Sequence, residues 1–196
     1  MNPLQNLYED IDILKDSKIG KVTLVYDRTG KQVCVMKERS LKTFELYSRL
    51  KEIKNPCLPE IYRTVKFGDA LFVVEEFVEG QTLAEILTYQ GALNEKISAQ
   101  ILKQVCDCLK ILHAEKIIHR DLKPSNIMLT KDNQVKLIDF SISRIAKDNL
   151  ESDTDFLGTR GYAPPEQFGF GQTDARSDIF SLGVTMKKVL GESYSG

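Results

Sequence analysis

The spacing of apolar residues changes near residue 80, and this change limits the folds open to the chain. Residues 21–27 (KVTLVYD) and 31–38 (KQVCVMKE) alternate apolar residues with others, and DRTGK between them is typical of a turn. The run ALFVVEEFVEG at 70–80 predicts a further strand, and 40–54 a helix with Ser40 as its N-cap. Beyond residue 82 the apolar residues follow helical spacing, most clearly in 82–91, 94–116 and 178–191. We therefore predict an α+β protein with a strand-rich lobe at 1–79 and a helical lobe at 80–196.

Composition narrows the class of partner. The chain has 196 residues and a net charge of −1, so we expect no nucleic-acid partner. The first sixteen residues are acidic and lack a long apolar run, and no stretch reaches the roughly 18 apolar residues of a membrane span. We expect a cytoplasmic protein with no membrane segment, and a ligand site in the cleft between the two lobes.

One eight-residue stretch, HRDLKPSN at 119–126, combines a carboxylate, two cations and an amide. Its companions occur in a fixed order: CVMK at 34–37, LIDFS at 137–141, GTRGYAPPEQ at 158–167 and RSDIFSLG at 176–183. Together they resemble the eukaryotic-like protein serine/threonine kinase family, in its bacterial branch, over about residues 14–190. The resemblance implies the bilobal protein-kinase-like fold, with the last helices of the helical lobe absent from this sequence.

The resemblance also assigns roles around the motif. Asp121 would act as the base that accepts the proton of the attacking hydroxyl, and Lys123 would neutralise the transferring phosphate. Asn126 and Asp139 supply oxygen ligands, which suit Mg²⁺. Lysine at position 123 points to serine or threonine rather than tyrosine as the acceptor. His119 is expected to hold the loop by packing and hydrogen bonding.

Lys37 is the corresponding cation of the first lobe, and would reach the α- and β-phosphates of ATP. Val33, Val35 and Lys37 share one strand face because side chains alternate with period two. Glu45, in the following helix, is the expected ion-pair partner of Lys37, although its spacing is about one residue longer than the family's. Glu52 is the less favoured alternative, because it lies near the helix end.

The rest of the expected ATP site comes from apolar walls and a hinge. The resemblance implies a hinge at 76–78, where backbone groups of Glu76 and Val78 would bind adenine, and Glu75 occupies the preceding gatekeeper position. The remaining residues assigned to nucleotide binding are Gly20, Val22, Val35, Lys37 and Met128.

The sequence departs from the family pattern in three places. Lys15 and Ser17 replace the first two glycines of the phosphate loop, leaving Gly20. Ser141 replaces a glycine after Asp139-Phe140, and serine lacks the freedom of glycine at positive φ. The absence of the last helices removes the usual arginine partner of Glu166 and predicts exposed apolar surface, hence self-association.

The long loop at 141–172 adds further candidates. Arg120 would meet a phosphate on this loop, or else form a structural ion pair. Thr159 is expected to hold the substrate-binding segment through Asp121, and Ser152 or Thr154 would be the autophosphorylation site.

These observations predict a protein serine/threonine kinase that uses ATP and Mg²⁺ and acts on a protein substrate. The alternative is a pseudokinase, a binding or scaffolding module of the same fold, favoured by the lost glycines, Ser141 and the short C-terminus. Retention of the four charged or metal-binding residues weighs against it: Lys37, Asp121, Asn126 and Asp139. A small-molecule kinase is a third hypothesis, which the long loop with GTRGYAPPEQ disfavours.

Overall fold

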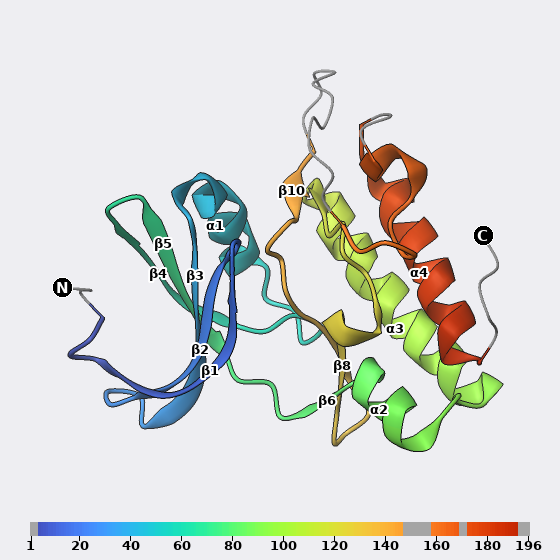
Figure 1. The fold of residues 1–196 in the computed structure, drawn as a ribbon, viewed down its shortest axis with the longest axis horizontal. Coiled ribbons are helices and arrows are strands. Elements are labelled where there is room, and N and C mark those ends of the chain that lie inside the picture. Colours follow the sequence, from blue (N-terminus) through green and yellow to red (C-terminus); the bar gives the residue numbers. More distant parts are fainter. Residues whose placement is uncertain (1–3, 147–157, 169–171, 192–196) are drawn as a thin grey trace. The chain divides into compact units, whose positions relative to one another are not determined.

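The structure is a computed structural model that describes residues 4–146, 158–168 and 172–191. It divides into two compact units, Met1–Val78 and Glu79–Gly196, and each is described by itself (Figure 1). Ser152 and Thr154 lie outside the described residues.

The first unit is built on a five-stranded antiparallel sheet of order β1-β2-β3-β5-β4 (Figure 1). The hairpin expected from the alternating residues is formed by two of these strands, β2 and β3. The strands are β1 (Tyr8–Ser17), β2 (Gly20–Asp27), β3 (Gln32–Ser40), β4 (Ile61–Phe67) and β5 (Ala70–Glu76).

The two faces of this sheet carry different kinds of residue. Cys34 and Val74 pack on one face in an apolar cluster with Leu4, Tyr8, Val25 and Phe72. The opposite face carries Val35, Lys37 and Arg39, because successive strand residues point to opposite sides. Ser40 caps the short helix η1 (Leu41–Thr43), which leads into α1 (Phe44–Glu52). Helix α1 contacts β4 and buries Leu46, Tyr47 and Leu50.

The second unit is mainly helical, as expected. Helices α2 (Leu83–Gln90) and α3 (Glu95–Ala114) come first, and α4 (Ala175–Val189) lies beside α3 (Figure 1). Thr82 and Asn94 cap the first two helices with their side-chain oxygens. Most of the apolar residues at helical spacing on α3 are buried, including Ile101, Val105, Cys108 and Leu112, whereas Ile97 near its start is 38% exposed.

Short strands and turns place the motif residues of this unit. Strands β6 (Gly80–Thr82), β8 (Ile127–Thr130) and β9 (Val135–Leu137) form a sheet in the order β6-β8-β9. Strand β7 (Ile117–Ile118) pairs with β10 (Arg144–Ile145). Two 3₁₀ turns, η2 (Pro124–Asn126) and η3 (Pro165–Phe168), complete the unit. HRDLKPSN thus runs from the end of β7 to the start of β8.

Within the described ranges, no helix is both long enough and apolar enough to cross a membrane.

Candidate active site

The loop that carries the HRD triplet is held by one buried carboxylate. Asp178, in the first turn of α4, is fully buried and accepts backbone N–H groups from His119 (2.9 Å) and Arg120 (2.8 Å). The Nε2 atom of His113 lies 2.7 Å from the same carboxylate. Arg120 has a positive φ of 69°, a strained conformation for a side chain of this size, and these bonds hold the loop in it. No sequence pattern indicated a role for His113 or Asp178.

His119 holds the loop from inside. It is fully buried, and Phe140 packs on its ring with the centroids 4.8 Å apart. The backbone N–H of Asp121 donates to Nδ1 (3.3 Å), so Nε2 carries the proton and donates to the carbonyl of Ile138 (3.2 Å). Burial lowers the pKa of His119, although nearby aspartates oppose this effect. The ring is therefore a neutral structural element, in agreement with its expected role.

Asp121 is the centre of the polar network. Its Oδ1 accepts from the Thr159 hydroxyl (2.7 Å), and its Oδ2 lies 2.7 Å from Nζ of Lys123. Lys123 Nζ also donates to the Thr159 hydroxyl at 2.7 Å. Thr159 thus bridges the HRDLKPSN loop at 119–126, which we call the catalytic loop, and the GTRGYAPPEQ segment, as expected from the sequence. The carboxylate is 10% exposed and is held from two sides, which fixes the direction of its lone pairs.

Asn126 and Asp139 lie on neighbouring stretches of backbone. Asn126 Nδ2 donates to the carbonyl oxygen of Asp121 and to its Oδ2, both at 2.8 Å, so its Oδ1 is the atom left for a metal. The backbone N–H of Ile138 donates to the Asn126 carbonyl (3.0 Å), which aligns the residue before Asp139 with the loop. Two side chains with oxygen donors fit Mg²⁺, whose remaining ligands are commonly water and phosphate. Among the described residues no three His, Cys, Asp or Glu side chains gather as a metal site of their own.

Ser141 does not need the freedom of the glycine that it replaces. Within the described ranges the non-glycine residues with positive φ include Asp139 (63°) but not Ser141. The backbone N–H of Ser141 donates to Oδ1 of Asp139 (3.3 Å), and Phe140 is buried. The Asp-Phe-Ser segment is therefore compatible with serine in this conformation.

The end of the long loop is attached to α4 and to the catalytic loop. Glu166 accepts a hydrogen bond from the Ser177 hydroxyl (2.7 Å), and Gln167 Nε2 donates to the Arg120 carbonyl (2.9 Å). The Ser181 hydroxyl donates to the carbonyl of Tyr162 at 2.9 Å. Glu166 thus has a hydroxyl partner within these residues, a contact that the sequence pattern did not indicate.

In the first unit, Lys37 forms an ion pair with Glu75. Both side chains are 7% exposed. The β3–β5 register places Val35 opposite Glu75 and Lys37 opposite Val73, so Lys37 and Glu75 are diagonal neighbours on one face. Glu75 occupies the gatekeeper position expected from the sequence, and no sequence pattern indicated this pair.

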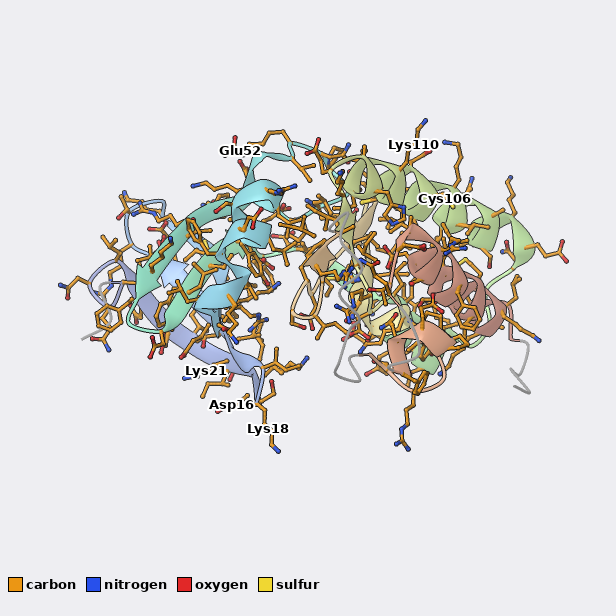
Figure 2. The ribbon with its side chains drawn as sticks, turned by 90° about the horizontal axis from the view of Figure 1, so that it is seen from above. Asp16, Lys18, Lys21, Glu52, Cys106 and Lys110 are labelled. Carbon is orange, nitrogen blue, oxygen red and sulfur yellow. The ribbon has the colours of Figure 1, made fainter. Side chains whose placement is uncertain are left out.

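The expected pair between Lys37 and Glu45 is wrong for this structure. Glu45 is in the first turn of α1, its side chain is 71% exposed, and it pairs with Arg49 one turn later at 2.8 Å. The adjacent residues Leu46 and Tyr47 take the inward positions. The one-residue excess in spacing therefore rotates the carboxylate away from the core. Figure 2 shows the alternative, Glu52, at the end of α1 with its side chain on the surface.

The remaining candidates of the first unit lie on or beside the same sheet. Val22 lies opposite Lys37 in the β2–β3 register, so Val22, Val35 and Lys37 share a face. Gly20 follows the two-residue turn between β1 and β2, where Figure 2 shows Lys18 directed outward. A Cβ on Gly20 would lie 1.9 Å from the Glu38 carbonyl oxygen, and φ is 129°. Glycine is thus required here by backbone packing.

The expected hinge begins at the end of β5. Glu76 ends β5, and its backbone N–H donates to the Glu60 carbonyl at 2.8 Å. Val78 is buried and is the last residue of the first unit. Met128 is half-buried in β8 of the second unit. Their roles in adenine binding stay predictions.

Comparison with known proteins identifies the class. Residues 8–194 match the protein kinase domain family, so the chain belongs to this family, and the predicted family and bilobal fold class are confirmed. Serine/threonine-protein kinase PknB of Mycobacterium tuberculosis is 36% identical over 145 residues, which are 70% of this chain and 23% of that protein. PknB of Mycolicibacterium smegmatis gives the same values. Serine/threonine-protein kinase PknL of M. tuberculosis is 36% identical over 155 residues, 78% of this chain and 39% of that protein. The chain thus spans less than half the length of these relatives.

Proposed function

We propose that this chain transfers the γ-phosphate of ATP to serine or threonine hydroxyls of a protein substrate. The observation that carries the proposal is the network at Asp121, where Lys123, Thr159 and Asn126 fix a single carboxylate. Family membership and the similarity to two serine/threonine kinases support the same activity. The structure also removes one argument for the pseudokinase alternative, because Ser141 does not require a glycine conformation.

In the proposed reaction the acceptor hydroxyl lies against Asp121. Asp121 orients the hydroxyl and takes its proton as the new O–P bond forms and the bond from the γ-phosphorus to the leaving ADP oxygen breaks. Lys123 sits 2.7 Å from the same carboxylate, where its charge would stabilise negative charge on the transferring group. Asn126 and Asp139 would hold Mg²⁺, which when bound neutralises charge on the phosphates.

Residues of the first unit would bind the nucleotide in the proposed reaction. Lys37 would bind the α- and β-phosphates, with Glu75 in place of Glu45 as the carboxylate that holds it. The other residues proposed for nucleotide binding are Gly20, Val22, Val35, Glu76, Val78 and Met128. We assign residues 1–78 to the N-lobe and 79–196 to the C-lobe, following the two compact units.

Two expectations of the sequence stay predictions within this proposal. Self-association would be visible as a concentration-dependent mass in analytical ultracentrifugation. A cytoplasmic location would be tested by cell fractionation.

The test is transfer of labelled phosphate from γ-labelled ATP, with Mg²⁺, to a mixture of serine, threonine and tyrosine peptides. Asp121→Asn should lower the rate by about 10²-fold or more. The matched control is Asp132→Asn, an exposed aspartate in the turn between β8 and β9, which should leave the rate unchanged. Equal rates in wild type and Asp121→Asn, or label on tyrosine alone, would contradict the proposal.

A further inference from the structure

A pocket of about 530 Å³ lies beside the catalytic loop, wholly within the second unit. It is formed by α2, the catalytic loop, the segment at 159–162 and α4. Two of its lining residues, Lys123 and Thr159, contact Asp121 directly at 2.7 Å each. The pocket therefore begins where the acceptor hydroxyl of a protein substrate would lie, and a substrate segment next to that hydroxyl would pass over it.

The charged residues that line the pocket are all positive. Among the described residues its lining contains two lysines, Lys123 and Lys188, and no carboxylate. Lys123 is already paired with Asp121. Lys188, in the last turn of α4, is exposed, and its Nζ lies 5.5 Å from the ring centroid of Tyr162. In the parts of the chain that the structure describes, Lys188 has no carboxylate partner.

The rest of the lining suits a short flexible side chain that ends in an anion. Leu87, Pro124 and Tyr162 contribute apolar surface, which would contact methylene groups. Ser125 contributes a hydroxyl that can donate a hydrogen bond to a carboxylate, whereas the Thr88 hydroxyl already donates to the carbonyl of Ala84 (2.8 Å). A basic side chain would meet Lys188 without any carboxylate in the lining to compensate its charge, and like charges repel.

We propose that this pocket binds an acidic side chain of the protein substrate, close in sequence to the phosphorylated residue, and that Lys188 is the residue that selects it. This inference rests on the proposed kinase activity and adds a substrate class to it. An extended peptide advances about 3.3 Å per residue, so the selected acid occupies one fixed position within a few residues of the acceptor.

The test uses the full chain and peptides that contain one serine in a neutral background. Glutamate is moved through the positions on either side of the serine, and kcat/KM is compared with that of the peptide with glutamine at the same place. For the wild type we expect one position at which the Glu/Gln ratio of kcat/KM is about 10. Lys188→Gln should bring that ratio close to one, and Lys188→Glu should make lysine preferred over glutamate there.

The matched control is Lys110→Glu, which changes the net charge by the same amount. Lys110 is exposed on α3, is not part of the pocket lining, and points outward in Figure 2, so its replacement should leave the position profile and the ratio unchanged. A flat wild-type profile, or a preference that survives Lys188→Glu, would overturn the acidic-substrate inference alone. Absence of transfer to every peptide, in wild type and Asp121→Asn alike, would overturn the kinase proposal and this inference with it.

Discussion

The ion pair between Lys37 and Glu75 can be separated experimentally from the pair that the family pattern suggests. Glu75→Gln keeps the shape of the side chain and removes its charge. Both members of the pair are 7% exposed, so the interaction is made away from solvent. Fully buried Tyr47 lies close enough for the charges of Lys37 and Glu75 to act on its phenol, whose pKa is raised mainly by burial. The side chains of Lys37, Glu75 and Tyr47 are therefore largely shielded from bulk water on this face of the sheet.

The expected cost follows from that burial. Breaking a buried ion pair by removing one partner costs about 3–5 kcal/mol, because the remaining buried charge loses that interaction. Stabilities of natural domains are about 5–15 kcal/mol, so Glu75→Gln should remove a large share of the unfolding free energy. Lys37→Met should have a similar effect. The double variant should be less destabilised than the sum of the single variants, with a coupling energy of about 2–3 kcal/mol.

The assay is urea unfolding followed by far-ultraviolet circular dichroism, since the chain contains no tryptophan for fluorescence. The matched control is Glu45→Gln, the same chemical change at a side chain that is 71% exposed and paired with Arg49. An exposed i,i+4 pair contributes about 0.3–0.5 kcal/mol, so this control should change little. Thermal stabilisation by Mg-ATP should be weakened in Glu75→Gln and kept in Glu45→Gln.

Two results would contradict the predicted role of the Lys37–Glu75 pair. One is strict additivity of Glu75→Gln and Lys37→Met, which would mean that the two side chains do not interact. The other is a loss of stability and of nucleotide binding in Glu45→Gln rather than in Glu75→Gln, which would restore the pair expected from the sequence.

Three further predictions concern His119, Gly20 and Thr159. A histidine in the unfolded chain has a pKa of about 6.5, whereas burial lowers the pKa of His119 in the folded protein. The stability that comes from keeping His119 neutral is therefore fully present above pH 6.5 and is lost as the pH falls below that value. The unfolding free energy should fall by up to about 1.4 kcal/mol per pH unit there, and His119→Gln should remove this part of the slope, as measured by urea titrations at several pH values. Gly20→Ala should destabilise by more than about 3 kcal/mol, since its Cβ would lie 1.9 Å from a carbonyl oxygen, and thermal unfolding would show it. Thr159→Val should lower the phosphotransfer rate by about 10- to 100-fold, because the hydroxyl that joins Lys123 to Asp121 is lost, and Thr159→Ser should restore it.

Each of these has a control within the chain. His113→Gln should keep the part of the pH slope due to His119, and an unchanged slope in His119→Gln would contradict the assignment. Gly68→Ala has a positive φ but open space around the new Cβ, so it should cost only about 1 kcal/mol, and equal losses at the two glycines would argue against steric contact. A Thr159→Val enzyme as fast as the wild type would show that the bridge is not needed for transfer.

The class of fold and the family could be predicted because the signals are local. The alternation in β2 and β3, the apolar run of β5 and the cap at Ser40 all depend on residues close in sequence. The grouping of Asp121, Lys123 and Asn126 in one site could be predicted for the same reason, because they lie within six consecutive positions of one loop.

The missed contacts join residues far apart in the chain. Asp178 holds residues 58 and 59 positions before it, and Glu75 reaches Lys37 only through the β3–β5 register. Glu45 was misplaced because a shift of one residue turns a helical side chain by about 100°, enough to exchange a buried position for an exposed one. The spacing excess noted in the sequence was the available signal for this error.

The role of Asp121 as the base is tested by intact-mass spectrometry after incubation with Mg-ATP, with the wild type and Asp121→Asn measured side by side. We expect the wild type to gain the mass of one or more whole phosphates and Asp121→Asn to gain none. Equal gains in both proteins, or no gain in either, would contradict the assignment of Asp121 as the base of a protein kinase.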